Sequence, residues 1–238
     1  MSGAEWATAS AVVALAAFVQ GAVGFGLVLV AAPLVTLIDP RLVPGPLLVC
    51  AVLLSVVMAW RERQGLDGVG VAWAFAGRVP GSVVGALLLA MMTATQLEMA
   101  VAGTVLFGVA VTASGIHVPL RRATLLAAGF LSGVMGTTTA IGGPPIAIMY
   151  QHETGPNLRG TLAGFFVMGS LLSMATLAWV GRFGALEVGD GVLLAPAALA
   201  GYGASVPATR FLDRGYTRTA VLAVSAAAAI VLLVRRLG

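Results

Sequence analysis

Long apolar runs separated by short polar linkers make up almost the whole chain. Because a helix needs about 20 mostly apolar residues to cross the hydrocarbon layer of a bilayer, each run predicts membrane-spanning structure. The pattern therefore predicts an all-α integral membrane protein with about eight transmembrane segments and no extramembrane domain. The runs cover residues 6–38, 42–60, 70–92, 97–115, 123–150, 160–180, 190–209 and 217–234.

Composition agrees with this interpretation. The chain of 238 residues is 59% hydrophobic and only 9% charged, whereas soluble domains carry about 25% charged residues. Its net charge of +4 comes from arginines spread over the linkers, so the clustered basic face of a nucleic-acid-binding protein is missing. The expected partners are the lipid bilayer and a small solute, without nucleic acid.

Two glycine-rich segments, residues 20–33 and 132–146, interrupt apolar runs at equivalent places. The matched positions are Gly21 with Gly133, Gly24 with Gly136, and Pro33 with Pro145. Glycine and proline weaken helices, and backbone freed inside a bilayer must be satisfied by protein or by a water-filled cavity. Paired interrupted helices are typical of secondary transporters, which bind substrate there.

The spacing of the two segments predicts an internal duplication. We expect two four-segment repeats, residues 1–116 and 117–238, each beginning with a broken segment. Four crossings per half would make the repeats parallel, whereas broken segments that enter and leave on one side would make them inverted; the sequence leaves both open. On the eight-crossing scheme, Arg61 and Arg235 share one side, and the count of flanking arginines favours both termini in the cytoplasm.

The motifs at these places resemble those of a known family. They are Gly21-x-x-Gly24-Phe25-Gly26 before Pro33, Gly133-x-x-Gly136 before Ile141-Gly142-Gly143-Pro144-Pro145, and Arg159-Gly-Thr-Leu-Ala163. Over essentially its whole length the chain resembles the TauE/SafE family, also called the sulfite exporter family. The resemblance implies a permease for sulfite, thiosulfate or organosulfonates in the bacterial inner membrane.

A sulfur oxyanion needs hydrogen-bond donors that replace its hydration shell, and helix N-termini offer free N–H groups and a favourable dipole. Thr137, Thr138 and Thr139 add hydroxyls to the second segment, while the first has mainly Gln20, so we expect a site weighted toward the second half. The alternative is that the glycines relieve packing and the threonines bond their own helix. The candidate substrate-binding residues are Gln20, Gly21, Gly24, Phe25, Gly26, Gly133, Gly136, Thr137, Thr138, Thr139, Gly142, Gly143, Pro144 and Arg159.

Two arginines are open to a functional interpretation. Arg159 starts a span and is either a gate or an anchor at the membrane surface. Arg78 is interpreted as an interfacial anchor. All nine acidic residues lie near segment ends, which argues against a buried proton relay. Export of an anion needs none, because an inside-negative potential contributes about 2.3 kcal/mol per charge per 100 mV outward.

The main hypothesis is therefore export of a sulfur-containing anion. A scaffold or accessory subunit without transport, or an importer of a different small anion, remains the alternative. An enzyme is not expected, because no catalytic dyad lies at membrane depth. His117 and His152 lie in loops without metal-binding spacing, so neither a metal nor a cofactor is expected, and the oligomeric state is left open.

Overall fold

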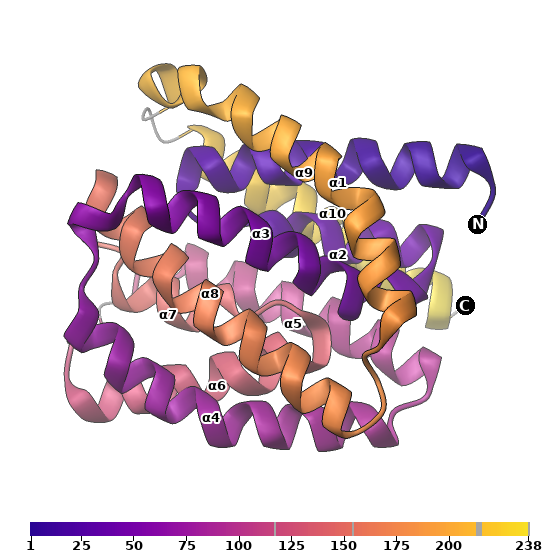
Figure 1. Ribbon diagram of the computed structural model, residues 1–238, viewed down its shortest axis with the longest axis horizontal. Helices are drawn as coiled ribbons and strands as arrows, with labels where there is room; N and C mark the ends of the chain where they lie inside the picture. The colour runs from indigo at the N-terminus through magenta and orange to yellow at the C-terminus, as the bar shows by residue number, and fades with distance from the viewer. Residues whose placement is uncertain (117, 154, 213–215, 238) are drawn as a thin grey trace.

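The structure, a computed structural model, describes residues 1–116, 118–153, 155–212 and 216–237, and these form helices joined by short turns without any strand. Figure 1 shows the helices packed in one bundle. Short 3-10 turns lie at Pro40–Leu42 and Arg63–Gly65. The α-helices are α1 Gly3–Val23, α2 Leu27–Ile38, α3 Gly45–Arg61, α4 Gly68–Met91, α5 Ala94–Ala113, α6 Arg122–Thr139, α7 Gly143–Met149, α8 Gly155–Trp179, α9 Ala185–Leu212 and α10 Tyr216–Leu237.

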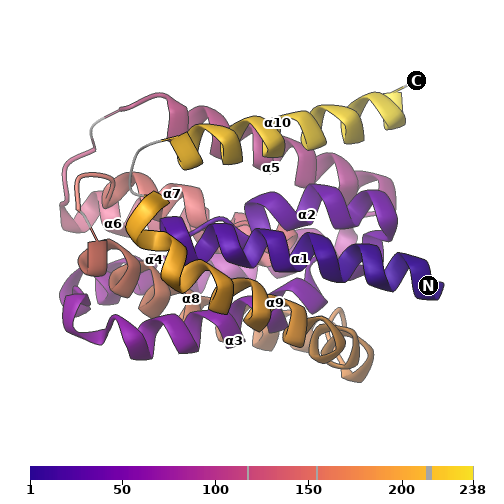
Figure 2. The same ribbon diagram turned by 90° about the horizontal axis from the view of Figure 1, so that it is seen from above.

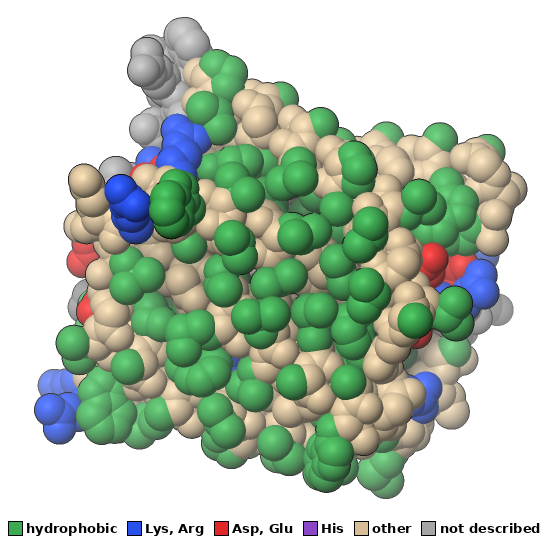
Figure 3. Space-filling model, in the orientation of Figure 1, with side chains coloured by type: hydrophobic (Ala, Val, Ile, Leu, Met, Phe, Trp, Pro, Cys, Tyr) green, Lys and Arg blue, Asp and Glu red, His purple; other side chains and the backbone are tan. Residues whose placement is uncertain are grey.

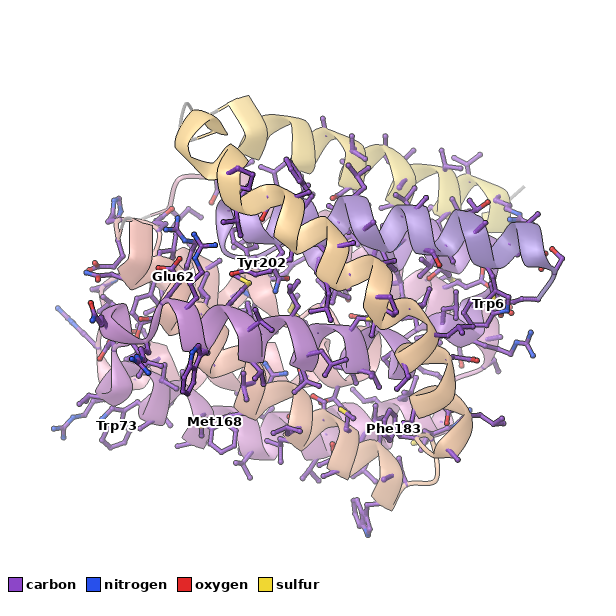
Figure 4. All side chains as sticks on the ribbon, turned by 45° about the horizontal axis from the view of Figure 1, so that its top comes forward. Trp6, Glu62, Trp73, Met168, Phe183 and Tyr202 are labelled. Atoms are coloured by element: carbon purple, nitrogen blue, oxygen red, sulfur yellow. The ribbon has the colours of Figure 1, made fainter. Side chains whose placement is uncertain are left out.

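The helices have the length and surface of a membrane protein. Five described segments are long and apolar enough to cross a bilayer, and Leu27–Ile38 and Leu222–Arg235 are shorter apolar helices. Figure 3 shows hydrophobic side chains over the middle of the visible face and most charged side chains toward two opposite ends. Figure 4 places Trp6 and Trp73 near opposite ends, where tryptophan suits the membrane–water interface. The five spans are Gly3–Val23, Pro40–Arg61, Gly68–Met91, Ala94–Ala113 and Asn157–Trp179.

The two ends of the bundle are defined by contacts between distant segments. Both chain termini lie at one end, here called the terminal end (Figures 1 and 2), where a surface hollow is lined by Trp6, Pro40 and Thr93 among others. At the other end, here called the opposite end, Glu62 pairs with Arg159.

The helix pairs α1/α2 and α6/α7 each turn back on themselves. Trp6, near the start of α1, and Pro40, just after α2, line the same hollow at the terminal end. At the opposite end, Gln151 after α7 donates from its Nε2 to the carbonyl oxygen of Ile116 before α6, at 2.6 Å. Each pair thus returns to the end at which it began.

This return overturns the expected distribution of arginines. Arg61 ends α3 at the opposite end, whereas Nη1 of Arg235 donates to the carbonyl oxygen of Leu37 at the terminal end, at 3.2 Å. The expectation that Arg61 and Arg235 share one side is wrong, because it counted each interrupted pair as a single crossing.

Close helix packing fixes the middle of the bundle. Helix α4 packs along α6 and α1 along α9, while α5 lies beside α10 (Figure 2). A Cβ added at Gly77 or Gly81 of α4 would strike backbone carbonyls of α6. Glycines spaced four residues apart let membrane helices approach closely, and this contact brings the middle of α4 against the first half of α6.

Candidate functional site

Two short non-helical segments separate the paired helices. The first, residues 24–26, contains Gly24 at φ 99° and Gly26 at φ 126°, conformations that favour glycine because it lacks a Cβ. The second, residues 140–142, contains Ala140 at φ 63°. These segments coincide with the two glycine-rich stretches of the sequence.

Side chains of the preceding helices hold both segments. Oε1 of Gln20 accepts a hydrogen bond from the backbone N–H of Leu27 at 3.0 Å, which satisfies one of the free donors at the start of α2. In the second segment, Oγ of Ser132 donates to the carbonyl oxygen of Gly142 at 2.5 Å. Each turn is therefore tied to the helix that leads into it.

One cavity lies between the two segments and has a volume of about 40 Å³. A water needs about 10–15 Å³ by this measure, so the cavity has room for a few waters or a small anion. Helices α2, α3, α4 and α8 complete its wall. The lining residues are Gln20, Phe25, Gly26, Val28, Leu29, Ala51, Ser55, Arg78, Ala140, Ile141, Gly142, Gly143, Pro144, Phe166 and Ser170.

Among the residues that the structure describes, Arg78 supplies the only charged side chain of this lining. It lies ten residues after Gly68, the start of α4, which corresponds to about 15 Å along a helix and thus to the middle of a hydrocarbon layer of about 30 Å. Its side chain is 2% exposed. The interpretation of Arg78 as an interfacial anchor is wrong, because α4 begins well before this residue and packs it inside the bundle.

Helices α6 and α8 hold the guanidinium of Arg78. Nη1 donates to Oγ of Ser132 at 2.8 Å, and Nη2 donates to Oγ of Ser173 at 3.4 Å. Cζ lies 5.0 Å from the centre of the Phe165 ring, within the range of a cation–π contact. Nε has no hydrogen-bond partner among the described residues.

Three glycines make the space that the guanidinium occupies. A Cβ added at Gly136 would lie 2.8 Å from Nη2 of Arg78, and one at Gly142 would lie 3.0 Å from Nη1. A Cβ at Gly169 would come still closer to the guanidinium. Gly136 and Gly142 were expected to face the ligand, and the structure gives them this additional role.

The three threonines of α6 have protein partners. Oγ1 of Thr138 donates to the carbonyl oxygen of Val134 and Oγ1 of Thr139 to that of Met135, both at 2.8 Å. Oγ1 of Thr137 lies 2.8 Å from Oγ of Ser173. None of the three lines the cavity, and their role as substrate ligands stays a prediction.

The remaining expected site residues have packing contacts. A Cβ added at Gly21 would strike Ser205 of α9, and one at Gly133 would meet the backbone of α4. Gly24 packs against the side chain of Arg159, whose Nε donates to Oε1 of Glu62 at 3.2 Å. The expected residues that do line the cavity are Gln20, Phe25, Gly26, Gly142, Gly143 and Pro144.

Sequence reasoning missed Ser55, Arg78, Phe166 and Ser170. The last two lie on α8 and Ser55 on α3, far from either glycine-rich segment in the chain, and nothing in their local sequence sets them apart. Arg78 carried a signal, namely a charge inside an apolar run. The position at which α4 begins determines how deep Arg78 lies in the membrane. Oδ1 of Asp67 accepts a hydrogen bond from the Gly70 N–H at 3.0 Å and caps α4 eleven residues before Arg78.

A second cavity lies between the first one and the opposite end. Its volume is about 80 Å³, and Val23, Thr112, Ile148, Gln151 and Leu158 contribute to its wall. Phe25 lines both cavities. Phe25 therefore belongs to the walls of both cavities, here called the inner cavity (about 40 Å³) and the outer cavity (about 80 Å³).

The described residues contain no group of three or more His, Cys, Asp or Glu side chains that could hold a metal ion. His152 lies in an exposed turn after α7. His117, the other histidine, lies outside the described residues.

Comparison with known families decides the kind of protein. The family model described as sulfite exporter TauE/SafE matches residues 9–232 of the 238-residue chain. The chain belongs to this family. As a TauE/SafE protein it is a multi-pass membrane transport protein whose substrate class is a small anion, and the family is one of transporters. No curated protein and no solved structure matches the chain.

Proposed function

We propose that this protein is a permease that exports a small sulfur-containing anion, namely sulfite, thiosulfate or an organosulfonate, across the bacterial inner membrane. The observation that carries the proposal is the inner cavity, which both non-helical segments and Arg78 line. Non-helical backbone at membrane depth is expected only where it is buried in protein or lines a polar cavity. The start of α2 adds a helix dipole that favours negative charge at the cavity.

The path of the chain supports an inverted repeat of residues 1–116 and 117–238. The α1/α2 pair begins at the terminal end and the α6/α7 pair at the opposite end, so equivalent helices run in opposite directions. The packing is reciprocal as well, because the first helix of each half packs on the third long helix of the other, α1 on α9 and α6 on α4. Transporters built this way bind substrate between the repeats.

The distribution of arginines supports one orientation of the protein in the membrane, and the membrane potential then supports export. Among arginines whose side chains the structure describes, the opposite end holds Arg61, Arg63, Arg121, Arg122 and Arg159, and the terminal end holds Arg41, Arg182 and Arg235. The positive-inside rule then places the opposite end in the cytoplasm and the termini outside. An anion would enter the outer cavity from the cytoplasm, pass Phe25, and leave down the membrane potential.

The test is counterflow in proteoliposomes loaded with sulfite, thiosulfate or methanesulfonate, with Gly143→Leu as the blocking variant. A Cβ at Gly143 meets only ordinary contacts at 3.5 Å or more, with Phe166 and Phe25, so a leucine would fill the cavity without striking the backbone. Gly103→Leu on α5 is the matched control, because nothing lies within 4 Å of its Cβ.

We expect at least a tenfold loss of counterflow for Gly143→Leu and an unchanged rate for Gly103→Leu. Absence of flux for every anion with folded wild-type protein would favour a non-transporting accessory subunit. Uptake that occurs only against the potential would favour an importer. Equal rates for the two leucine variants would remove the cavity from the path.

One further variant tests the threonines as ligands. Because Oγ1 of Thr138 already donates to the carbonyl oxygen of Val134, Thr138→Val should leave anion affinity within about twofold of wild type. A loss of tenfold or more, the size expected for a lost hydrogen bond to a charged ligand, would show that Thr138 binds the anion.

A further inference from the structure

Arg78 is a buried cation whose charge no described carboxylate neutralises. The ion pairs among the described residues join Arg41 with Asp39, and Arg61 and Arg159 with Glu62. A guanidinium stays protonated in proteins, so a full positive charge lies in the middle of the bundle. Burying a charge without an opposite one is costly.

The hydrogen bonds of Arg78 leave part of its donor capacity unused. A guanidinium carries five N–H donors, and the described residues supply two acceptors, the hydroxyls of Ser132 and Ser173. Nε has no described partner, and neither has the fully buried hydroxyl of Ser55, which lines the same cavity. The unsatisfied donors and the unneutralised charge both indicate an anionic ligand.

The two halves differ at the position of Arg78. The shift of 120 residues that aligns Gly81 with Gly201 places Arg78 on Ala198, which is buried in α9. In the described part of the chain, no other charged side chain lines the cavity. The site therefore offers a single positive charge.

Resting on the permease function proposed above, we propose that Arg78 binds the transported anion and that its single charge selects monovalent oxyanions. Hydrogensulfite and sulfonates carry one charge and form a neutral pair with the guanidinium. Thiosulfate and sulfate carry two, and the second charge would be buried without compensation. The planar fork of Arg78 suits two oxygens of one anion better than a spherical chloride.

The experiment measures anion affinity of the purified full-length protein by calorimetry at fixed pH and ionic strength. Methanesulfonate is the monovalent probe, with thiosulfate, sulfate and chloride as comparisons. For wild type we expect methanesulfonate to bind at least tenfold tighter than each of the other three. Arg78→Gln should weaken methanesulfonate binding at least tenfold, and Arg78→Lys should retain an intermediate affinity, because a lysine keeps the charge without the fork.

Thermal unfolding separates binding from a structural role. Arg41→Gln is the control, since Arg41 is an exposed arginine at the terminal end, and it should bind as wild type does. A ligand-free Arg78→Gln with Tm equal to or above wild type and reduced affinity fits an anion-binding residue. A lowered Tm with unchanged affinity overturns the proposal and leaves Arg78 a structural role.

The outcomes also distinguish this proposal from the permease function. Wild-type preference for thiosulfate or sulfate, or equal affinity for chloride, would overturn the selectivity assigned to Arg78 even if every variant failed to fold. Counterflow of any sulfur anion would meanwhile keep the permease function. Failure of all wild-type counterflow would instead remove the function on which the proposal rests.

Discussion

In the first non-helical segment two glycines with positive φ, Gly24 and Gly26, flank Phe25, whereas in the second a single alanine, Ala140, has a positive φ. The two segments also differ in the side-chain hydrogen bonds that hold them. Gln20 caps the helix after the first segment with one hydrogen bond, while Ser132 joins the second segment to Arg78 through two.

The two non-helical segments thus lie at equivalent places in the two halves but differ in their residues and contacts. The first segment carries Phe25, which lines both cavities, between two glycines with positive φ. The second segment is joined through Ser132 to Arg78, the residue that we propose binds the anion.

The largest expected effect comes from removing the glycines of the first segment. In Gly24→Ala/Gly26→Ala each alanine must adopt a left-handed backbone, which costs about 1–2 kcal/mol per residue. The Cβ at Gly24 would also lie 3.0 Å from Cγ of Arg159. We expect the free energy of unfolding, measured in detergent, to fall by about 2–4 kcal/mol.

Gly103→Ala provides the control for this double variant. Gly103 lies within α5 with nothing near its Cβ, so alanine there should raise stability by up to about 1 kcal/mol. A double variant as stable as wild type would contradict the conclusion that Gly24 and Gly26 have positive φ angles that disfavour alanine.

A smaller loss is expected from Ser132→Ala in the second segment. The change leaves the carbonyl oxygen of Gly142 and Nη1 of Arg78 without their described partner, and an unsatisfied buried group costs about 1–3 kcal/mol. Ser225→Ala is the matched control, because the buried hydroxyl of Ser225 has no described partner and its removal should cost little. Equal losses of unfolding free energy in both variants would contradict the conclusion that the hydrogen bonds of Ser132 hold the second segment to Arg78.

The smallest effect is expected from Ala140→Gly. Glycine would relieve the left-handed backbone of Ala140 but would add freedom to the unfolded chain, worth about 0.4–1 kcal/mol, so the net change should stay below about 1 kcal/mol. Ala127→Gly on the exposed face of α6 should instead lower the unfolding free energy by about 0.5–1 kcal/mol. A loss at residue 140 as large as that of the double glycine variant would show that the two segments are not held differently.

Much of this molecule could be predicted locally. Apolar runs broken by polar linkers predict an all-α membrane protein because the bilayer imposes the length and polarity of each helix. The ends of α1 and α6 lie in the two glycine-rich segments, and glycine weakens a helix wherever it lies. The motifs there also predicted the family that the comparison confirmed.

The site itself depended on contacts between residues far apart in the chain. From the sequence, Arg78 is interpreted as a membrane-surface arginine, and only the start of α4 and the packing of α6 show that it is buried. Gly136, Gly142 and Gly169, from three different parts of the chain, leave the space for its guanidinium. The sequence alone determined helices, membrane and family, because these follow from the solvent and from neighbouring residues. Only the tertiary structure decided that each helix pair turns back and that a single charge is enclosed between both segments, because burial and partners depend on which helices meet.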